Sequence, residues 1–142
     1  MAKLAIMCGL PRSGKTTRAK SLESEGWVRV CPDNIRLELH GQPFVKEAES
    51  RVWAVARDRA RSLLKGDHKV LIDATNLTRQ SRRSWRKLAD EFGLILDIYL
   101  VETPLEVCLA RNTGTGAVPE DVLRRMNETY QRPTESEGRV IF

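Results

Sequence analysis

Residues 9–16 read Gly-Leu-Pro-Arg-Ser-Gly-Lys-Thr, and they match the pattern G-x-x-x-x-G-K-[ST]. The unbroken apolar run Leu4–Cys8 comes directly before them and is typical of a buried strand in a parallel sheet. In this order of strand, glycine turn and helix, the backbone N–H groups of the loop surround phosphate oxygens. We therefore predict a nucleotide-binding loop with contacts from Gly9, Arg12, Ser13, Gly14, Lys15, Thr16 and Thr17.

Two side chains of this loop have expected roles in chemistry. Lys15 is expected to reach the β and γ phosphates, and the Thr16 hydroxyl to bind magnesium. The loop alone does not separate a kinase from a GTPase, an ATPase motor or a nucleotide switch. The acceptor side of any reaction has to be inferred from other residues.

Apolar runs and helical periodicity alternate along the rest of the chain. Further strands are expected over 27–30, 70–73 and 94–101, and residues 140–142 form either a terminal strand or a packing tail. Helices are expected from Lys15 and over 32–40, 48–64, 78–92, 105–110 and 119–130. The alternation predicts a single α/β domain over residues 1–142, with a central parallel sheet of four to five strands, helices on both faces and a small lid at about 111–118.

The composition indicates an anionic partner. Lysine and arginine total 24 against 19 acidic residues, which gives a net charge of +5, and 17 of the 24 are arginine. The planar guanidinium group binds phosphate oxygens in pairs, so phosphate is the expected anion. No apolar run approaches the roughly 20 residues of a membrane span, and the three cysteines form no C-x-x-C pair. We expect a cytoplasmic protein without a membrane partner, a disulfide framework or a zinc site.

Asp33 and Arg36 follow the second expected strand, at a spacing that puts them on one face of a helix. A carboxylate at this edge of the sheet can accept the proton of an attacking hydroxyl. The arginine can hold a neighbouring anionic group of the acceptor. The alternatives are a helix N-cap for Asp33 and a solvated surface charge for Arg36.

Asp73 ends the third expected strand, the usual place of a carboxylate that binds magnesium or its water shell. The alternative is a cap for the turn formed by Thr75 and Asn76. Arg111 precedes the expected lid loop Asn112–Gly116, where an arginine can stabilise charge on a transferring phosphoryl group. Its alternative is an arginine that interacts with the dipole at a helix C-terminus.

The helix after Asn76 carries a stripe of arginines on one face. At the end nearest the site, these side chains can bind the phosphates of a polymeric acceptor, although such a stripe is also typical of a solvated face. The stripe consists of Arg79, Arg82, Arg83 and Arg86. The arginines of the longest helix are expected to be solvated: Arg51, Arg57, Arg59 and Arg61.

With these segments in order, the chain resembles the 5′-hydroxyl polynucleotide kinases, especially the bacteriophage end-healing type. The resemblance extends over most of the chain. It implies a P-loop kinase fold with ATP and Mg²⁺ as cofactors. The matching elements are GLPRSGKTT at 9–17, D-x-x-R at 33–36, D-x-T-N at 73–76 with R-R-x-W at 82–85, R-N at 111–112 and A-V-P-x-D-V-L at 117–123.

The resemblance also implies roles for single residues. Lys15 and Thr16 would serve the ATP phosphates and magnesium, and Asp33 would be the general base for the 5′-hydroxyl. Arg36 would hold the 3′-phosphate of the acceptor's terminal nucleotide, and Arg111 would contact the donor phosphates. We place on the acceptor side Asp33, Arg36, Asp73, Thr75, Asn76 and Arg83, and we assign magnesium to Thr16 and Asp73.

Two departures from the bacteriophage enzyme matter. Only residues 113–116 separate Arg111-Asn112 from Ala117, so the second lid arginine of that enzyme is missing. Arg111 therefore acts alone, or Arg12 replaces the missing residue by reaching the donor phosphates or the acceptor. The D-x-D-x-[TV] motif of a 3′-phosphatase does not occur in these 142 residues.

We predict an ATP-dependent polynucleotide kinase that transfers the γ-phosphate of a nucleoside triphosphate to the 5′-hydroxyl end of DNA or RNA, in nucleic-acid end healing. The alternatives are a P-loop kinase for a sugar, nucleoside or antibiotic, and a nucleotide-dependent binding module. The absence of an N-K-x-D base-recognition motif counts against a GTPase-type switch.

Overall fold

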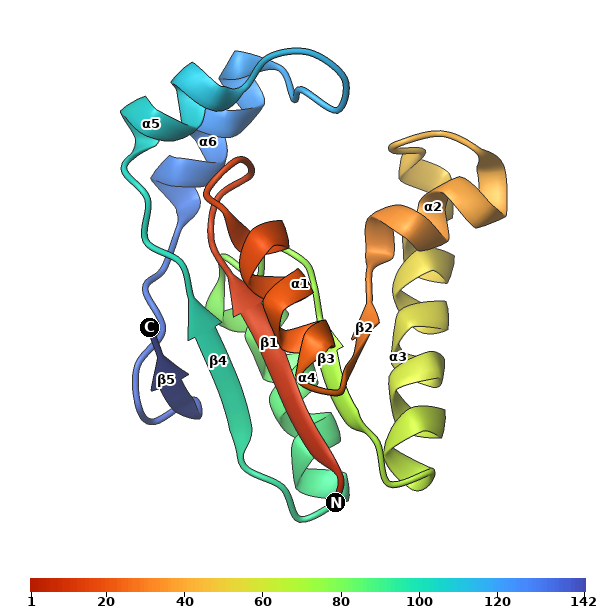
Figure 1. Cartoon of the computed structure of the whole chain (residues 1–142). Coiled ribbons are helices and arrows are strands. Elements are labelled where there is room, and N and C mark those ends of the chain that lie inside the picture. Colours follow the sequence, from red (N-terminus) through yellow and green to blue (C-terminus); the bar gives the residue numbers. More distant parts are fainter.

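Five parallel strands form the central sheet of the computed structural model, which describes residues 1–142 (Figure 1). Their order is β2-β3-β1-β4-β5, so β1 lies in the middle. Every neighbouring pair is parallel. The strands are β1 (Lys3–Cys8), β2 (Trp27–Val30), β3 (Lys69–Ile72), β4 (Leu96–Leu100) and β5 (Arg139–Ile141).

Helices connect each strand to the next. Between β1 and β2 lies α1 (Lys15–Ser24), and between β2 and β3 lie α2 (Pro32–His40), the 3-10 helix η1 (Lys46–Ala48) and α3 (Glu49–Lys65). Between β3 and β4 lies α4 (Arg79–Glu91), and between β4 and β5 lie α5 (Leu105–Arg111) and α6 (Glu120–Thr129). The predicted α/β fold is confirmed, and the C-terminal residues form a fifth strand instead of a packing tail.

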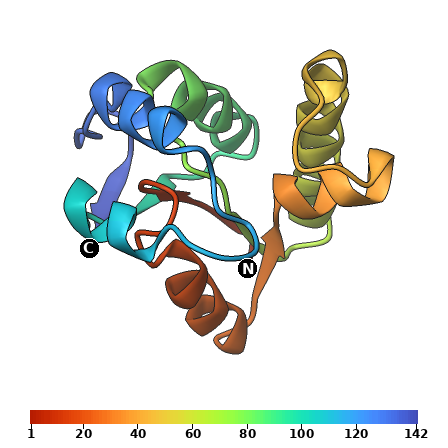
Figure 2. The same ribbon diagram turned by 90° about the horizontal axis from the view of Figure 1, so that it is seen from above.

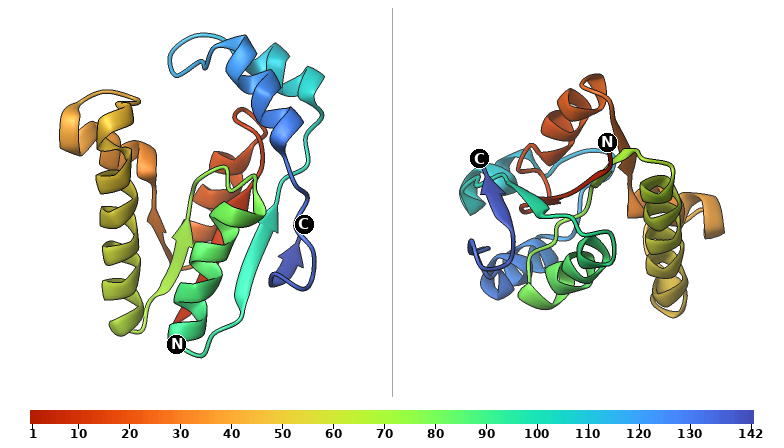
Figure 3. Two further views of the ribbon diagram at one scale, coloured as in Figure 1. Left: turned by 180° about the vertical axis from the view of Figure 1, so that it is seen from behind. Right: turned by 90° about the horizontal axis from the view of Figure 1, so that it is seen from below.

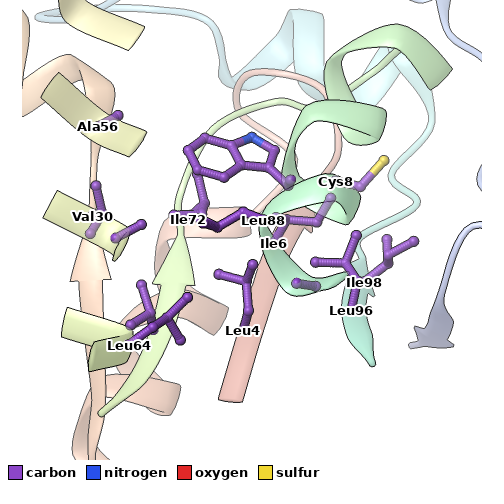
Figure 4. Packing of buried hydrophobic residues seen from close by; sticks show 14 of the residues in the cluster. Leu4, Ile6, Cys8, Val30, Ala56, Leu64, Ile72, Leu88, Leu96 and Ile98 are labelled. Carbon is purple, nitrogen blue, oxygen red and sulfur yellow. The ribbon is translucent and has the colours of Figure 1, made fainter. Parts of the chain in front are cut away.

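Successive side chains of β1 enter two different cores, because neighbouring residues of a strand point to opposite faces. Leu4, Ile6 and Cys8 belong to the larger core, where they pack with residues of α3 and α4 (Figure 4). Ala5 and Met7 pack against α1 on the other face. A one-residue slip of β1 would exchange the two sets, so this double burial fixes its register. Figure 3 shows α3 and α4 on the same side of the sheet.

Strand β4 is shorter than the apolar run 94–101 predicts. Helix α4 is followed by Gly93 in the left-handed conformation, with φ 66°, and the N–H of Leu94 donates to the Ala89 carbonyl at 2.9 Å. These contacts close the C-terminus of the helix, as glycine commonly does. Ile95 is then exposed, and the strand begins at Leu96.

A third apolar cluster holds the last two helices above the carboxyl edge of the sheet. Leu10, which follows β1, is buried with Leu77, Cys108 of α5 and Leu123 of α6. The loop between α5 and α6, residues 112–119, extends across this edge (Figure 2). The lid that the sequence predicts at about 111–118 falls on this loop, which we call the lid; its closing over a ligand stays a prediction.

None of the helices is both long enough and apolar enough to cross a bilayer. All three cysteines are free and buried.

Arg82 is not part of an exposed stripe, so this part of the sequence prediction is wrong. Its side chain is 1% exposed and lies between α4 and the C-terminal segment. It donates to Glu137 Oε1 at 2.7 Å, to the Asn76 carbonyl at 2.8 Å and to the Gln131 carbonyl at 2.7 Å. The helical spacing is as predicted, but the segment around Glu137 covers this side of the helix.

Replacing Arg82 by methionine removes a fully buried cation that binds the half-buried Glu137 carboxylate and two backbone carbonyls. We expect the free energy of unfolding to fall by about 3–5 kcal/mol, the usual cost of breaking a buried pair from one side. Chemical denaturation at pH 7 measures the loss. Arg124→Met is the control, because Arg124 forms an exposed ion pair with Glu120 and should cost at most about 1 kcal/mol.

The substitution Glu137→Gln tests the Arg82–Glu137 ion pair through the pH dependence of the free energy of unfolding. Burial acts to raise the pKa of Glu137, but the hydrogen bonds from Arg82 and the Thr134 N–H outweigh it and lower the pKa. The stabilisation is thus present above the unfolded pKa of about 4.3 and disappears as the pH falls through the lower folded pKa. Equal stability of the wild type, Arg82→Met and Glu137→Gln at pH 7 would contradict a stabilising role of this ion pair.

Candidate active site

Backbone geometry shapes the loop after β1. A Cβ atom at Gly9 would lie 2.8 Å from the Val101 carbonyl and 2.9 Å from Ser13 Oγ, so only glycine fits there. Arg12 has φ 67° and Gly14 has φ 105°, both in the left-handed region. Alternation with left-handed residues turns successive N–H groups toward one concave side, the form of an anion-binding nest. Ser13 Oγ is buried there without a hydrogen-bond partner.

Lys15 spans this loop from the first turn of α1. Its side chain is buried, and Nζ donates to the Leu10 carbonyl at 2.8 Å. Burial lowers the pKa of Lys15, and the charges of Asp73 and Asp33 act in the opposite direction. Thr16 and Thr17 are exposed at the start of α1, where anions bind.

Asp73 comes directly after β3 and is 7% exposed. Its Oδ2 accepts from Arg29 Nε at 2.7 Å, and Arg29 lies on the neighbouring strand β2. This pair joins the carboxyl ends of two parallel strands. The other carboxylate oxygen, Oδ1, has no hydrogen bond within the chain, and no hydrogen bond of Asp73 caps the following turn.

Thr16 and Asp73, the residues expected to hold magnesium, would supply only part of the coordination shell of the ion. The Thr16 hydroxyl and Asp73 Oδ1 both lack an internal hydrogen-bond partner. The chain has no group of three or more His, Cys, Asp or Glu side chains that could hold a metal ion. Mg²⁺ usually takes one or two protein ligands and completes its octahedron with substrate phosphates and water. Thr16 and Asp73 suit that mode of binding.

Asp33 and Arg36 form an ion pair at the start of α2. Arg36 Nη1 lies 2.6 Å from Asp33 Oδ1, and the Asp33 side chain is 80% exposed. The N-cap of α2 is Cys31, and Asp33 lies one position beyond Pro32. Asp33 is thus not the cap that the sequence leaves open as an alternative, and Arg36, at 14% exposure, is not a solvated charge.

Glu49 holds Arg36 from the first position of α3. Arg36 Nε donates to Glu49 Oε2 at 2.9 Å, and Nη2 donates to Oε1 at 2.7 Å. The Arg36 guanidinium also lies 5.8 Å from the centre of the Trp53 ring. The hydrogen bonds to Glu49 raise the pKa of Arg36, while the arginine lowers the pKa of Glu49. The two hydrogen bonds to Glu49 orient the guanidinium so that Nη1 faces Asp33.

The segment after Asp73 anchors the phosphate-binding loop. The Gly9 N–H donates to the Thr75 carbonyl at 3.0 Å, and Asn76 Nδ2 donates to the Met7 carbonyl at 2.7 Å. Asn76 is 3% exposed and has φ 45°, a conformation that asparagine adopts more readily than most residues. The structure therefore gives the D-x-T-N element a supporting contact with the end of β1.

Arg12 connects this loop to the lid. Its Nη2 donates to the carbonyls of Thr113 and Thr115, at 3.3 and 3.0 Å. Arg111 Nη1 donates back to the Arg12 carbonyl at 3.4 Å. Asn112 closes the base of the lid, because its side chain donates to the Val118 carbonyl and accepts from the Val118 N–H. Both arginines named for the donor phosphates thus lie at the lid.

The structure brings most predicted site residues to one edge of the sheet. The phosphate-binding loop, Asp33, Arg36, Asp73 and Arg111 all lie on segments that follow parallel strands. Arg83 is exposed on α4. Three supporting residues were missed by sequence reasoning: Arg29, Glu49 and Asn112. The partners of Arg29 and Glu49 are brought to them only by the tertiary structure. Asn112 could have been found from the sequence, because it directly follows Arg111 at the start of the expected lid loop.

Comparison with known proteins identifies relatives. The AAA domain family matches residues 4–133. The bifunctional polynucleotide phosphatase/kinase of Schizosaccharomyces pombe is 27% identical over 96% of this chain and 31% of its own length. The L-seryl-tRNA(Sec) kinase of Methanococcus maripaludis is 27% identical over 92% of this chain and 53% of its own length. The chain thus spans less than two thirds of either relative.

Solved structures share the fold. A chain of the Pnkp1/Rnl/Hen1 RNA repair complex is 26% identical, with a TM-score of 0.79 over 90% of this chain and 43% of that one. A Janibacter sugar kinase has a TM-score of 0.70 over 99% of this chain and 84% of that one. Its 19% identity shows the fold alone.

Arg12→Ala removes both donor contacts from the loop to the lid. We expect amide hydrogen exchange at Thr113, Ala117 and Val118 to become about three- to tenfold faster, because each exposed hydrogen bond contributes about 0.5–1 kcal/mol. Exchange measured by mass spectrometry on the peptide 112–118 tests this. Arg18→Ala serves as the control, since Arg18 contacts Phe142 and not the lid. An unchanged exchange rate in Arg12→Ala would show that the hydrogen bonds of Arg12 do not hold the loop 112–118 in place.

Proposed function

Because the chain belongs to the AAA domain family and is a P-loop kinase, we propose that it transfers the γ-phosphate of ATP to the 5′-hydroxyl end of DNA or RNA. The observation that carries the proposal is the cluster of Asp33, Arg36 and Glu49, which lies at the same carboxyl edge of the parallel sheet as the phosphate-binding loop. A carboxylate beside a guanidinium group, which binds phosphate through paired hydrogen bonds, suits an acceptor that carries both a hydroxyl and a phosphate.

The donor side is assigned to the loop itself. The backbone N–H groups of residues 12–17 and Lys15 Nζ would bind the β and γ phosphates, with Lys15 exchanging the Leu10 carbonyl for phosphate oxygens. Ser13, whose hydroxyl is buried and unpaired, would gain a partner. Mg²⁺, bound through Thr16 and Asp73, would neutralise developing charge on the phosphates. Arg111, and Arg12 after release from the lid carbonyls, would approach the transferring group.

The acceptor side is assigned to α2. Asp33 would take the proton of the 5′-hydroxyl as that oxygen forms its bond to the γ-phosphorus. The bond from the γ-phosphorus to the β–γ bridging oxygen breaks, and ADP leaves. Arg36 would bind the 3′-phosphate of the terminal nucleotide. Thr75, Asn76 and Arg83 complete this side as residues for which the acceptor contact stays a prediction.

The named relatives favour a nucleic-acid acceptor. One is a polynucleotide kinase and the other a seryl-tRNA kinase, at the same 27% identity. Both names describe an acceptor with a polynucleotide backbone, which suits the basic charge of this chain. A sugar, nucleoside or antibiotic acceptor rests on shared fold alone. A role in end repair and a cytoplasmic location stay predictions.

Replacing Asp33 by asparagine removes the proposed base and keeps the size of the side chain. We expect kcat for phosphate transfer to a 5′-hydroxyl oligonucleotide to fall about 10²–10⁴-fold, the usual contribution of a general base. The affinity for ATP should stay within about twofold, because the proposal assigns Asp33 to the acceptor and not to the donor. Initial rates with labelled ATP and an ATP titration measure the two quantities.

The matched control is Asp58→Asn, an exposed aspartate on α3 whose side-chain exposure of 81% resembles that of Asp33. It should transfer phosphate at the wild-type rate. A wild-type rate in Asp33→Asn would exclude Asp33 as the base. A wild-type enzyme that binds ATP and labels no 5′-hydroxyl end would refute the proposed function.

A further inference from the structure

A groove of about 580 Å³ lies between α3 and α4, on the face of the sheet opposite α1. Its upper end is formed by Asn76 and Thr78, in the segment that follows Asp73. Trp53 and Arg57 line it from α3. The groove therefore starts at the candidate active site and continues away from it along two helices. We call it the α3–α4 groove.

The charge of the α3–α4 groove has one sign. Arg57, Arg83 and Lys87 line it, and no Asp or Glu does. None of the three forms an ion pair within the chain, whereas other arginines of the same helices pair with carboxylates: Arg59 with Glu38, Arg61 with Glu91 and Arg86 with Asp90. Positive charge without internal partners attracts an anion. This differs from the solvated face expected for Arg57 from the sequence.

Aromatic rings connect the groove to Arg36, the residue proposed to hold the 3′-phosphate of the acceptor. Trp53 is half-buried, and it faces both the groove and the guanidinium of Arg36. Arg57 lies 5.9 Å from the centre of the buried Trp85 ring. Cations and aromatic rings thus alternate from Arg36 through Trp53 and Arg57 to Trp85 in the groove. Cations that follow a backbone, together with an aromatic surface for bases, are the features of single-strand binding sites.

We propose that the α3–α4 groove binds the nucleotides that follow the 5′-terminal one in a single-stranded acceptor. The inference rests on the proposed function, since Arg36 marks where the terminal nucleotide sits. Phosphates would contact Arg57, Arg83 and Lys87, and a base would stack on Trp53. A volume of about 580 Å³ is within the range of small-ligand sites.

The double variant Arg57→Gln with Lys87→Gln tests the groove. Glutamine keeps part of the Arg57 stem over Trp85 and removes only the charge. We expect the affinity for a fluorescent 5′-hydroxyl 12-mer, measured by anisotropy in low salt, to fall about five- to tenfold. The slope of log affinity against log salt should decrease by about 1.4, since each phosphate contact contributes about 0.7 for a single strand. The KM of a mononucleoside 3′-phosphate should not change.

The control is Lys20→Gln with Lys65→Gln, which removes the same charge from exposed positions outside the groove. It should bind the 12-mer like wild type. Thermal unfolding of both double variants shows whether they are folded, and Lys87→Gln alone, at an exposed position, should give about half the change in slope.

Three outcomes would overturn the proposal: a wild-type affinity and slope in a folded Arg57→Gln, Lys87→Gln variant, an equal loss in the control, or no binding of the 12-mer by wild type. Competition by polyglutamate of equal charge, as strong as by the unlabelled 12-mer, would also overturn it and indicate an acidic protein segment. If the 12-mer binds through the groove and is not phosphorylated, the proposed function fails and the groove stands.

Discussion

Strand β1 pairs with β3 on one side and β4 on the other, and the phosphate-binding loop leaves its carboxyl end at the centre of the sheet. The loop that follows it begins at Gly9, where the Val101 carbonyl leaves no room for a Cβ atom. The Thr75 carbonyl and the Asn76 side chain attach this point to the segment after β3. Because all strands are parallel, the remaining loops meet the phosphate-binding loop at the same edge.

Around this anchor, the charged groups of the site are held in pairs. Arg29 binds Asp73, Glu49 binds Arg36, and Arg12 binds the lid carbonyls. Buried charges need such partners, because an isolated one loses its hydration without compensation. Beside these pairs, three groups keep room for a further partner: Oδ1 of Asp73, the exposed carboxylate of Asp33 and the buried, unpaired hydroxyl of Ser13. The account requires donor and acceptor to exchange some of these internal contacts for their own phosphates.

The sequence predicted the parts of the site that depend on local patterns. The apolar strand before Gly9, the spacing of Asp33 and Arg36, and the place of Asp73 at a strand end follow from local rules. Arg29 and Glu49 could not be predicted, since their partners lie 44 and 13 residues away and are selected by packing of strands and helices. Arg82 shows the reverse case, because its helical face was predicted and its burial under the Glu137 segment was not.

The most direct measurement is transfer of labelled γ-phosphate from ATP, with Mg²⁺, to a panel of acceptors. The account predicts label on a 5′-hydroxyl oligonucleotide and on a mononucleoside 3′-phosphate, because both carry a 5′-hydroxyl and a phosphate for Arg36. It predicts none on a 5′-phosphorylated oligonucleotide, a free nucleoside or a sugar. Label on the free nucleoside or the sugar, with none on the oligonucleotide, would contradict the central claim and assign the P-loop kinase to a small-molecule acceptor.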